Sequence, residues 1–415
     1  MRHLLPAGAL ALALSTAARA AGPTVASLAR DYDGLSLSGA PSRVENAKLT
    51  AGHMTLTFAS GSHVPVVAGD RKLGFFFVGK GSFEYRAVDP IELPLVQFLV
   101  KKATSVKAEK AEKSLVLKDG FTEILVLAAN VELPKTEAGG GTALDAAFKA
   151  HRETFARIEE APPSSAFVQQ RLDAPSAGAL RVEASGGADT WTYRWDSIDE
   201  TDESLDVIRK EDIRASQEVR KHLWPTTISS QGLRDRRDPP PPLFVVTDIA
   251  YALKASKGRE AKLSVTETVV PLGRPRSVFG FGLHNAVWDA SGSGHITVRS
   301  VNLRSATLED GTPLSFLHDH GSLLVGLPAP AAPEKPLKIR FEIDGDFLVR
   351  PQGDSYWLLE GNWLPLPDHQ TGRLFTVHAD IRVAKPFVPF APGVTKSRRE
   401  EGDENVLVTE FDKPI

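Results

Sequence analysis

The sequence predicts a mainly β protein, built from β-sandwich domains with one amphipathic helix between them. Short alternating or wholly apolar runs recur along the chain, for example at 53–58 and 73–79, and turn residues separate them. One longer segment, 143–160, instead repeats its apolar residues at helical spacing. The 415 residues are 42% hydrophobic and 24% charged, which is the composition of a folded protein. That length predicts about two or three domains.

The first twenty residues have the pattern of an export signal. Arg2 precedes the apolar run 4–14, and the small residues Ala18 and Ala20 occupy the positions that a signal peptidase inspects. We therefore expect cleavage after Ala20 and a periplasmic or secreted mature protein. The apolar run is too short to span a bilayer, and no later segment has the roughly eighteen apolar residues that a membrane helix needs.

The composition also excludes several classes of chemistry and partner. The chain has no cysteine, so it has no disulfide, no thiolate metal ligand and no cysteine nucleophile. Its formal net charge is −3, which does not indicate a nucleic-acid partner. We therefore expect domains held together by their cores alone.

Residues 21–165 are expected to form an N-terminal β domain. Besides 53–58 and 73–79, strand patterns occur at 113–120 and 122–131, and the glycines at 138–141 then end the β pattern. This domain closes with the helix predicted at 143–160.

The helix prediction depends on a single apolar face. The residues on that face are spaced four, seven and three apart; they are Leu144, Phe148, Phe155 and Ile158. Thr142 and Asp145 form a capping pair at the start, and the prolines within 161–165 end the helix.

A middle region, 166–242, follows and ends in a proline-rich linker at 234–242. Its segment 189–197 reads as a strand that places three aromatic residues on one face: Trp191, Tyr193 and Trp195. Such a row indicates a core or an interdomain contact, and the alternative is a platform for a sugar or a peptide.

An acidic run lies at 198–206 in the same region. Its carboxylates Glu200, Asp202 and Glu203 are expected in a solvated loop. The alternative is a calcium site, although the spacing is not that of an EF-hand loop.

Strand patterns return from residue 243 and predict one β-sandwich of about 170 residues. This part resembles the N-terminal β domain of the aminopeptidase N family, the gluzincin metallopeptidases. The resemblance lies in the order and spacing of segments 262–272, 310–347, 361–393 and 405–415. Residues 25–165 also resemble the leader region of large secreted bacterial members.

The resemblance has departures at its most specific points. The family's Trp-Tyr-Pro turn is here Trp363-Leu364-Pro365. The proline of its next motif corresponds to Ala384 or Pro386, and its glycine to Gly393. In the family, a catalytic domain follows this β domain directly.

The family's zinc chemistry requires the motif H-E-x-x-H on a helix. None of the eleven histidines of this chain is followed by glutamate, and no two histidines lie four positions apart. The family's Gly-Ala-Met-Glu-Asn strand is absent too. No catalytic residue, metal ligand or cofactor can therefore be carried over.

One local metal candidate remains, formed by His318, Asp319 and His320. In a strand, residues two apart share a face, so the two imidazoles could meet one ion. The alternative is an exposed turn before the next strand.

The resulting hypothesis is a noncatalytic N-terminal region of an exported zinc aminopeptidase-like protein. It would scaffold a peptide cleft and dock a catalytic peptidase domain or chain, with the expected contact surface at Trp357, Trp363 and Pro365. The alternative is a stand-alone periplasmic β-sandwich module for binding or adhesion. An unrecognised hydrolase is a third reading, without a matching motif.

Overall fold

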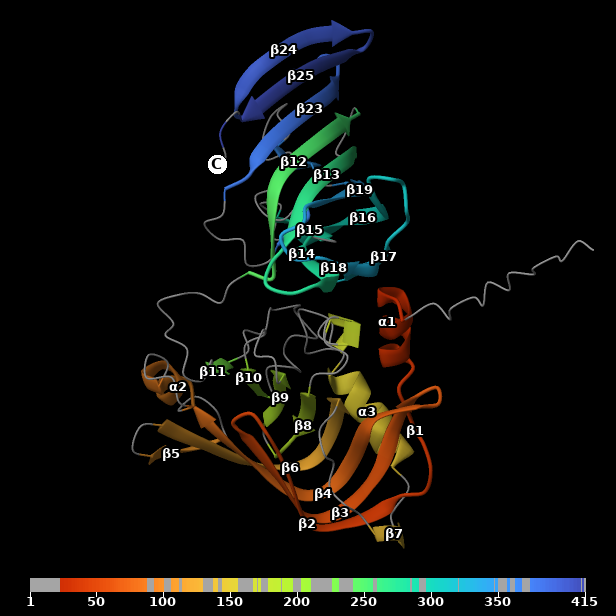
Figure 1. The fold of residues 1–415 in the computed structure, drawn as a ribbon. Helices are drawn as coiled ribbons and strands as arrows, with labels where there is room; N and C mark the ends of the chain where they lie inside the picture. Colours follow the sequence, from red (N-terminus) through yellow and green to blue (C-terminus); the bar gives the residue numbers. More distant parts are fainter. Residues whose placement is uncertain are drawn as a thin grey trace, which may run out of the picture.

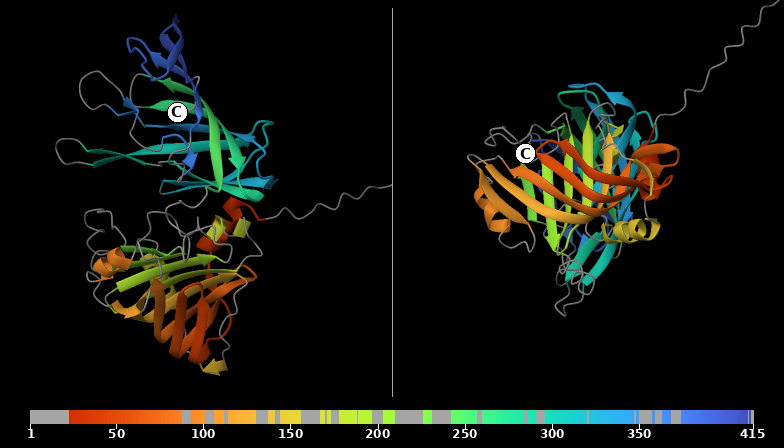
Figure 2. Two further views of the ribbon diagram at one scale, coloured as in Figure 1. Left: turned by 60° about the vertical axis from the view of Figure 1, so that its left-hand side comes forward. Right: turned by 90° about the horizontal axis from the view of Figure 1, so that it is seen from below.

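The computed structural model describes most of the chain. The described residues are 23–87, 93–100, 106–111, 114–129, 137–140, 144–155, 167–169, 171–172, 178–187, 189–196, 203–209, 226–230, 242–256, 260–283, 286–290, 296–319, 321–346, 348–349, 357–358, 363–367, 374–411 and 413. They form two β units, and Figures 1 and 2 show helix α1 between these units. The prediction of a mainly β protein is confirmed.

The first unit is an eleven-stranded sheet, which we call the rolled sheet. Its main path runs β11-β10-β9-β8-β6-β4-β3-β2-β7, while β1 pairs with β3 and β5 with β6. The strands are β1 Ser36–Leu37, β2 Ser42–Ala51, β3 Met54–Ala68, β4 Arg71–Ala87, β5 Lys107–Ala111, β6 Ser114–Ala129, β7 Glu137–Gly140, β8 Ala179–Ser185, β9 Asp189–Asp196, β10 Glu203–Arg209 and β11 Thr226–Ser230.

The sheet is rolled because its long strands change face along their length. In β3, Leu56 and Phe58 point into an aromatic interior, whereas Val64 and Val66 point to the opposite face. All four positions are even, so strict alternation would place them on one face. A β-bulge between Phe58 and Ser60 inserts the extra residue that reverses the alternation and bends the strand.

The interior of the roll is a packed aromatic core. Its largest fully buried members are Phe58, Phe77, Phe83, Tyr85, Phe121, Trp191 and Tyr193. Neighbouring rings meet edge-on or tilted, for example Phe83 and Trp191 with centroids 4.5 Å apart. The aromatic row predicted in β9 is therefore core, and Trp195 packs against its margin.

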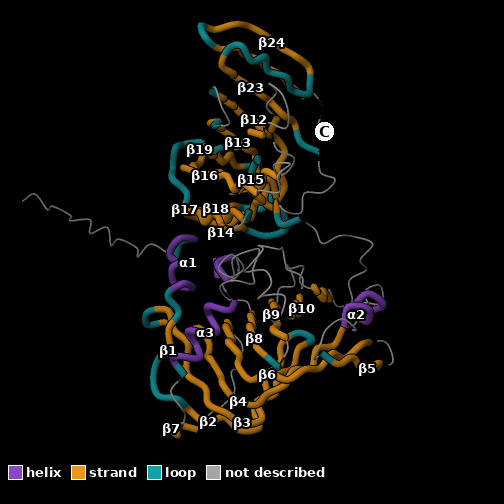
Figure 3. Tube along the Cα trace, turned by 180° about the vertical axis from the view of Figure 1, so that it is seen from behind, coloured by secondary structure: helices purple, strands orange, loops and turns teal. Residues whose placement is uncertain are grey.

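Helices cover the opposite face of the rolled sheet, as Figure 3 shows from behind. They are α1 Val25–Asp33 and α3 Asp145–Phe155, which pack together in a second core. A further helix, α2 Leu93–Val100, instead packs against the aromatic interior through Val96. Leu144, Phe148 and Phe155 are buried, which confirms the predicted apolar face of the helix at 143–160. Thr142 and Ile158 lie outside the described residues.

The second unit, which we call the sandwich, packs an eight-stranded sheet on a four-stranded sheet. Their orders are β15-β16-β19-β13-β12-β23-β25-β24 and β17-β18-β14-β22, and β20 pairs with β21 apart from both. The strands are β12 Phe244–Ala255, β13 Ala261–Pro271, β14 Arg276–Gly282, β15 Ala286–Ala290, β16 Ile296–Leu308, β17 Ser315–Asp319, β18 Ser322–Ala331, β19 Leu337–Gly345, β20 Leu348–Val349, β21 Trp357–Leu358, β22 Leu366–Pro367, β23 Thr376–Ala384, β24 Val394–Glu401 and β25 Glu404–Phe411.

Three local expectations differ from the structure. The glycines of 138–141 were expected to end the β pattern, but Gly139 and Gly140 belong to β7, which pairs with β2. The segments 113–120 and 122–131 were expected as two strands but form the single long strand β6. Gly120 does not interrupt this strand, because it stays in register opposite Ser82. The rolled sheet also continues past residue 165, where the sequence suggested the end of the N-terminal domain, since β8 pairs with β6. The proline run of the expected linker lies outside the described residues, as does nearly all of 234–242.

Candidate docking surface

The last three strands of the larger sandwich sheet form a ribbon that ends in an exposed edge strand. β23 runs parallel to β12 and antiparallel to β25, and β24 completes the order as the neighbour of β25. In β24, every residue except Ser397 is exposed. Figure 1 shows this ribbon at the end of the sandwich remote from the rolled sheet.

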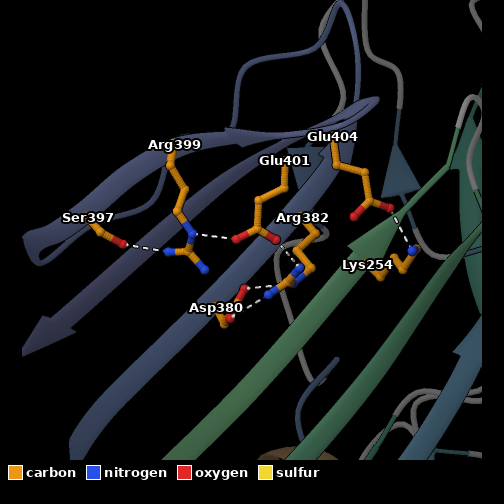
Figure 4. A network of polar contacts seen from close by, with 7 residues as sticks. All are labelled: Lys254, Asp380, Arg382, Ser397, Arg399, Glu401 and Glu404. Atoms are coloured by element: carbon orange, nitrogen blue, oxygen red, sulfur yellow. Dashed lines mark hydrogen bonds and ion pairs between the residues drawn. The ribbon is translucent and has the colours of Figure 1, made fainter.

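One face of the ribbon carries a row of paired charges, which we call the charge ladder (Figure 4). Arg382 on β23 lies 3.3 Å from Asp380 and donates a 2.7 Å hydrogen bond to Glu401 on β24. Arg399 donates to the other oxygen of Glu401 at 2.5 Å and to Ser397 at 2.8 Å. These positions share a face because side chains alternate along each strand.

The ladder also shields an apolar residue. Val406 of β25 lies in register between Arg382 and Arg399 and is fully buried, so the aliphatic stems of the two arginines cover it. Hydrogen bonds from Arg399 and then Arg382 lower the pKa of Glu401. The ladder is therefore a neutralised surface with no spare charge to attract a charged ligand.

The other face of the ribbon is covered by residues 385–394, which we call the apolar segment. The segment returns from the end of β23 to the start of β24 across the face that carries Leu407. The side-chain amide of Asn405 donates to the Phe387 carbonyl at 2.6 Å, and Arg398 donates to the Pro389 carbonyl at 3.4 Å. These bonds hold a proline-containing segment that a strand ladder could not accommodate.

Alternation along the apolar segment leaves large hydrophobic side chains in water. Pro389 is buried, whereas Val388 is 66% exposed, Phe390 88% and Val394 54%. Leu374, just before β23, is 63% exposed. Within the described part of the chain, these four are the large hydrophobic residues that stand out as exposed, and all lie between positions 374 and 394.

The residues expected at a docking surface lie in a different environment. Trp363 is half-buried and packs edge-on against Tyr251 with ring centroids 5.4 Å apart, and Pro365 is buried. The backbone of Trp357 pairs with Val349, and its side chain lies outside the described residues. Docking at these three residues stays a prediction, while the exposed apolar residues are those beside β23 and β24.

The apolar segment has a recognisable pattern in the sequence. Prolines at 386, 389 and 392 prevent the run from pairing as an inner strand, yet the intervening residues are apolar. Apolar residues in a segment that cannot join a sheet are candidates for surface exposure.

The metal candidate is only partly described. His318 lies on β17, and its Nε2 is 2.9 Å from the carbonyl oxygen of Leu283, so a backbone group already occupies that ring nitrogen. The side chains of Asp319 and His320 lie outside the described residues. The described residues contain no group of three or more His, Asp or Glu side chains arranged to hold a metal ion.

Glu203 corrects the expectation of a solvated acidic loop. It begins β10, and its side chain is nearly buried against the β2–β3 turn. One carboxylate oxygen accepts from the His53 backbone amide at 2.7 Å and from the Tyr193 hydroxyl at 2.5 Å, and the other lies 2.6 Å from His53 Nδ1. Glu200 and Asp202, the other members of the run, lie outside the described residues.

This contact closes the rolled sheet across many intervening strands. Gly52 has a φ of +55°, and a Cβ there would lie 2.5 Å from Trp195 and 2.7 Å from both Glu203 and Tyr193. Burial, followed by the charge of Glu203, raises the pKa of Tyr193, so the phenol stays protonated and donates. The cluster therefore acts as a structural seam, and sequence spacing gave no sign of it.

Comparisons with known proteins give a partial structural likeness. No protein-family model and no curated protein matches the chain. Solved structures that are similar include an M1 zinc metallopeptidase from Deinococcus radiodurans, with 18% identity, a TM-score of 0.34 and coverage of 43% of this chain and 42% of that one. A mutant two-domain M1 zinc metallopeptidase bound to L-arginine gives 17% identity, a TM-score of 0.34 and coverage of 41% and 40%.

The chain thus spans about two fifths of the length of these metallopeptidase structures. A TM-score of 0.34 does not establish membership of their family. None of the helices in the described part of the chain combines the length and the apolar character needed to cross a bilayer.

Proposed function

We propose that this chain is a noncatalytic scaffold region of an exported zinc aminopeptidase-like protein, and that its apolar segment docks a catalytic peptidase domain. The observation that carries the proposal is the clustering of exposed large hydrophobic residues. Phe390, Val388 and Val394 lie on one segment of the sandwich, and Leu374 lies just before β23. Exposed apolar groups that gather in one place mark interaction sites.

The charges around the apolar segment favour a protein partner over a lipid surface or a nucleic acid. Lys385 pairs with Glu400 at 2.6 Å, and Lys396 pairs with Glu410 at 3.0 Å. Both lysines are therefore already paired with acidic neighbours on the same ribbon. Apolar anchors within a polar, charge-balanced rim are typical of protein interfaces.

Catalysis is assigned to the partner domain, which would supply the zinc ligands that this sequence lacks as a motif. In this proposal, the sandwich forms one wall of a peptide cleft and holds the partner in position. Export is part of the proposal and rests on the signal pattern that ends at Ala20. Intact mass of the protein recovered from its producing cells would show loss of residues 1–20.

The test measures association and activity together. The mature chain is mixed with the product of the neighbouring gene, and complex formation is followed by analytical ultracentrifugation, alongside zinc content and aminopeptidase turnover. We expect activity only in the mixture, and loss of the complex in the Val388→Ser/Phe390→Ser double variant. The matched control is Lys335→Ser, an exposed position in the turn between β18 and β19.

Two results would overturn the proposal. Equal binding by the wild type and the double variant would remove the apolar segment from the interface. Zinc-dependent turnover by the isolated chain would place catalysis within it. If no mixture is active and the wild type binds no peptidase, the stand-alone binding or adhesion module becomes the better hypothesis.

A further inference from the structure

Helix α1 belongs to the core of both β units. Its buried residues Val25, Leu28, Ala29 and Tyr32 share one hydrophobic cluster with Phe76 and Leu125 of the rolled sheet. The same cluster contains Val278 and Leu324 of the sandwich. One short helix therefore buries a single face against two separate sheets.

The sandwich presents a surface suited to this helix. In β14 and β18, Phe279 and Val325 point into the sandwich core, so their neighbours Val278 and Leu324 point out of it. Both faces of these strands are thus apolar. Without the cover of α1 and its neighbours, the outer face would expose hydrophobic residues to water.

The first turn of α1 fits closely against this outer face. The Ala26 backbone amide, one of the free donors of a helix start, donates to the Ser315 hydroxyl of β17 at 3.1 Å. Gly326 of β18 leaves room for Val25, since a Cβ at Gly326 would lie 2.7 Å from Val25 Cγ2. The fit therefore requires a glycine at this position.

The last turn of α1 is fixed to the rolled sheet by polar contacts. The Tyr32 hydroxyl donates to the buried carboxylate of Glu183 on β8 at 2.8 Å. The Arg152 guanidinium of α3 lies over the Tyr32 ring at 4.4 Å and donates to the Tyr32 carbonyl at 3.1 Å. These contacts join residues more than a hundred positions apart.

We infer that α1 is a strap that couples the two β units, holding the sandwich and its apolar segment at a fixed orientation to the rolled sheet. The strap is attached at both ends: its first turn contacts Gly326 and Ser315 of the sandwich, and Tyr32 in its last turn is bonded to Glu183 of the rolled sheet. Release of the sandwich attachment frees the units to move relative to one another without unfolding either sheet. This inference does not depend on the proposed peptidase role.

The test uses the absence of cysteine in the chain. Nitroxide labels at Asp70→Cys on the rolled sheet and Lys335→Cys on the sandwich report the distance between the units by pulsed electron paramagnetic resonance. We expect a narrow distance distribution in the doubly labelled protein and a broad, shifted distribution when Gly326→Val is added. Circular dichroism checks that the β structure of the variant is retained.

Two further variants keep the test decisive. Gly280→Ala is the matched control on the same sheet, because its Cβ would meet Leu324 at an ordinary 3.5 Å, and its distribution should stay narrow. Val25→Ser weakens the same contact without adding bulk and should broaden the distribution even if Gly326→Val fails to fold. The inference would be overturned by an unchanged distance distribution in Val25→Ser, or by a broad distribution in the doubly labelled protein without a further substitution.

Discussion

Each β unit buries a glutamate in the middle of a sheet, and the two glutamates are in opposite electrostatic situations. Glu183 in the rolled sheet is 1% exposed and Glu267 in the sandwich is fully buried. Burial raises the pKa of Glu183, but the charges of Arg181, Arg152 and His151 outweigh it and leave the pKa lowered. Burial alone raises the pKa of Glu267 well above its usual range.

The difference lies in the neighbours of each carboxyl group. Glu183 accepts from the Tyr32 hydroxyl at 2.8 Å and lies 3.3 Å from the Arg181 guanidinium. Both carboxyl oxygens of Glu267 are without a hydrogen-bond partner, and Ile249 and Ile339 are its neighbours across the sheet. Equal burial therefore accompanies a lowered pKa in one unit and a raised pKa in the other, because only Glu183 has charged and hydrogen-bonding neighbours.

The largest expected effect comes from neutralising the compensated carboxylate. Glu183→Gln removes the negative charge that faces the partly buried Arg181 and Arg152 and should lower the free energy of unfolding by about 3 kcal/mol. Urea denaturation at neutral pH measures this change. Tyr32→Phe is the matched control, which removes one hydrogen bond but no charge and should cost about 1 kcal/mol. Equal losses in the two variants would show that charge compensation is not the main contribution.

A change of opposite sign is expected at the uncompensated carboxyl group. Glu267→Leu replaces a buried polar group without partners by an apolar one and should raise the free energy of unfolding by about 2 kcal/mol at pH 7. The control Glu267→Gln keeps a buried polar group, so its free energy of unfolding should rise less than that of Glu267→Leu. A destabilised Leu variant would mean that the carboxyl group has a favourable role in the sandwich.

The pH dependence of the same variants sharpens the comparison. The pKa of Glu267 is raised in the folded state. Its contribution to stability is therefore fully present below the pKa of glutamate in the unfolded chain, about 4.3, and is lost as the pH rises towards the folded-state pKa. The advantage of Glu267→Leu over wild type should therefore grow from pH 4 to pH 7. For Glu183 the folded pKa is lowered, so its contribution is present above the unfolded value and is lost as pH falls.

The smallest effect is expected in the charge ladder on the ribbon. Arg399 pairs with Glu401 at 2.5 Å, but the two side chains are 42% and 41% exposed. Water and salt screen such pairs, so Arg399→Ala should leave the urea midpoint unchanged within error. A clear loss of stability would instead indicate that the arginine stem over Val406 matters more than its charge.

Local patterns predicted the elements that depend on nearby residues. The alternation of 53–58 and 189–197 gave β3 and β9, and the spacing of Phe148 and Phe155 gave α3. Helix α1 was missed because it has only nine residues. A helix of that length is marginal by itself and gains its stability from packing, here against two sheets.

The apolar segment also depends partly on local sequence and partly on contacts between distant residues. The prolines and apolar residues of 385–394 are visible in the sequence, but their exposure depends on Asn405 and Arg398, which hold the segment over the ribbon. Trp363 and Pro365, whose docking role stays a prediction, are half-buried and buried in the fold. Which apolar residues remain in water depends on contacts between distant segments.

By itself, the sequence determined a mainly β protein without disulfides, because alternation and cysteine content are local properties. Only the tertiary structure decided which groups surround the acidic residues. Glu203 meets His53 across 150 positions, and Glu183 meets Tyr32 across 151, while Glu267 meets no polar partner at all among the described atoms. The partners of each carboxyl group are those that folding brings within about 3 Å, since hydrogen bonds act only at that range.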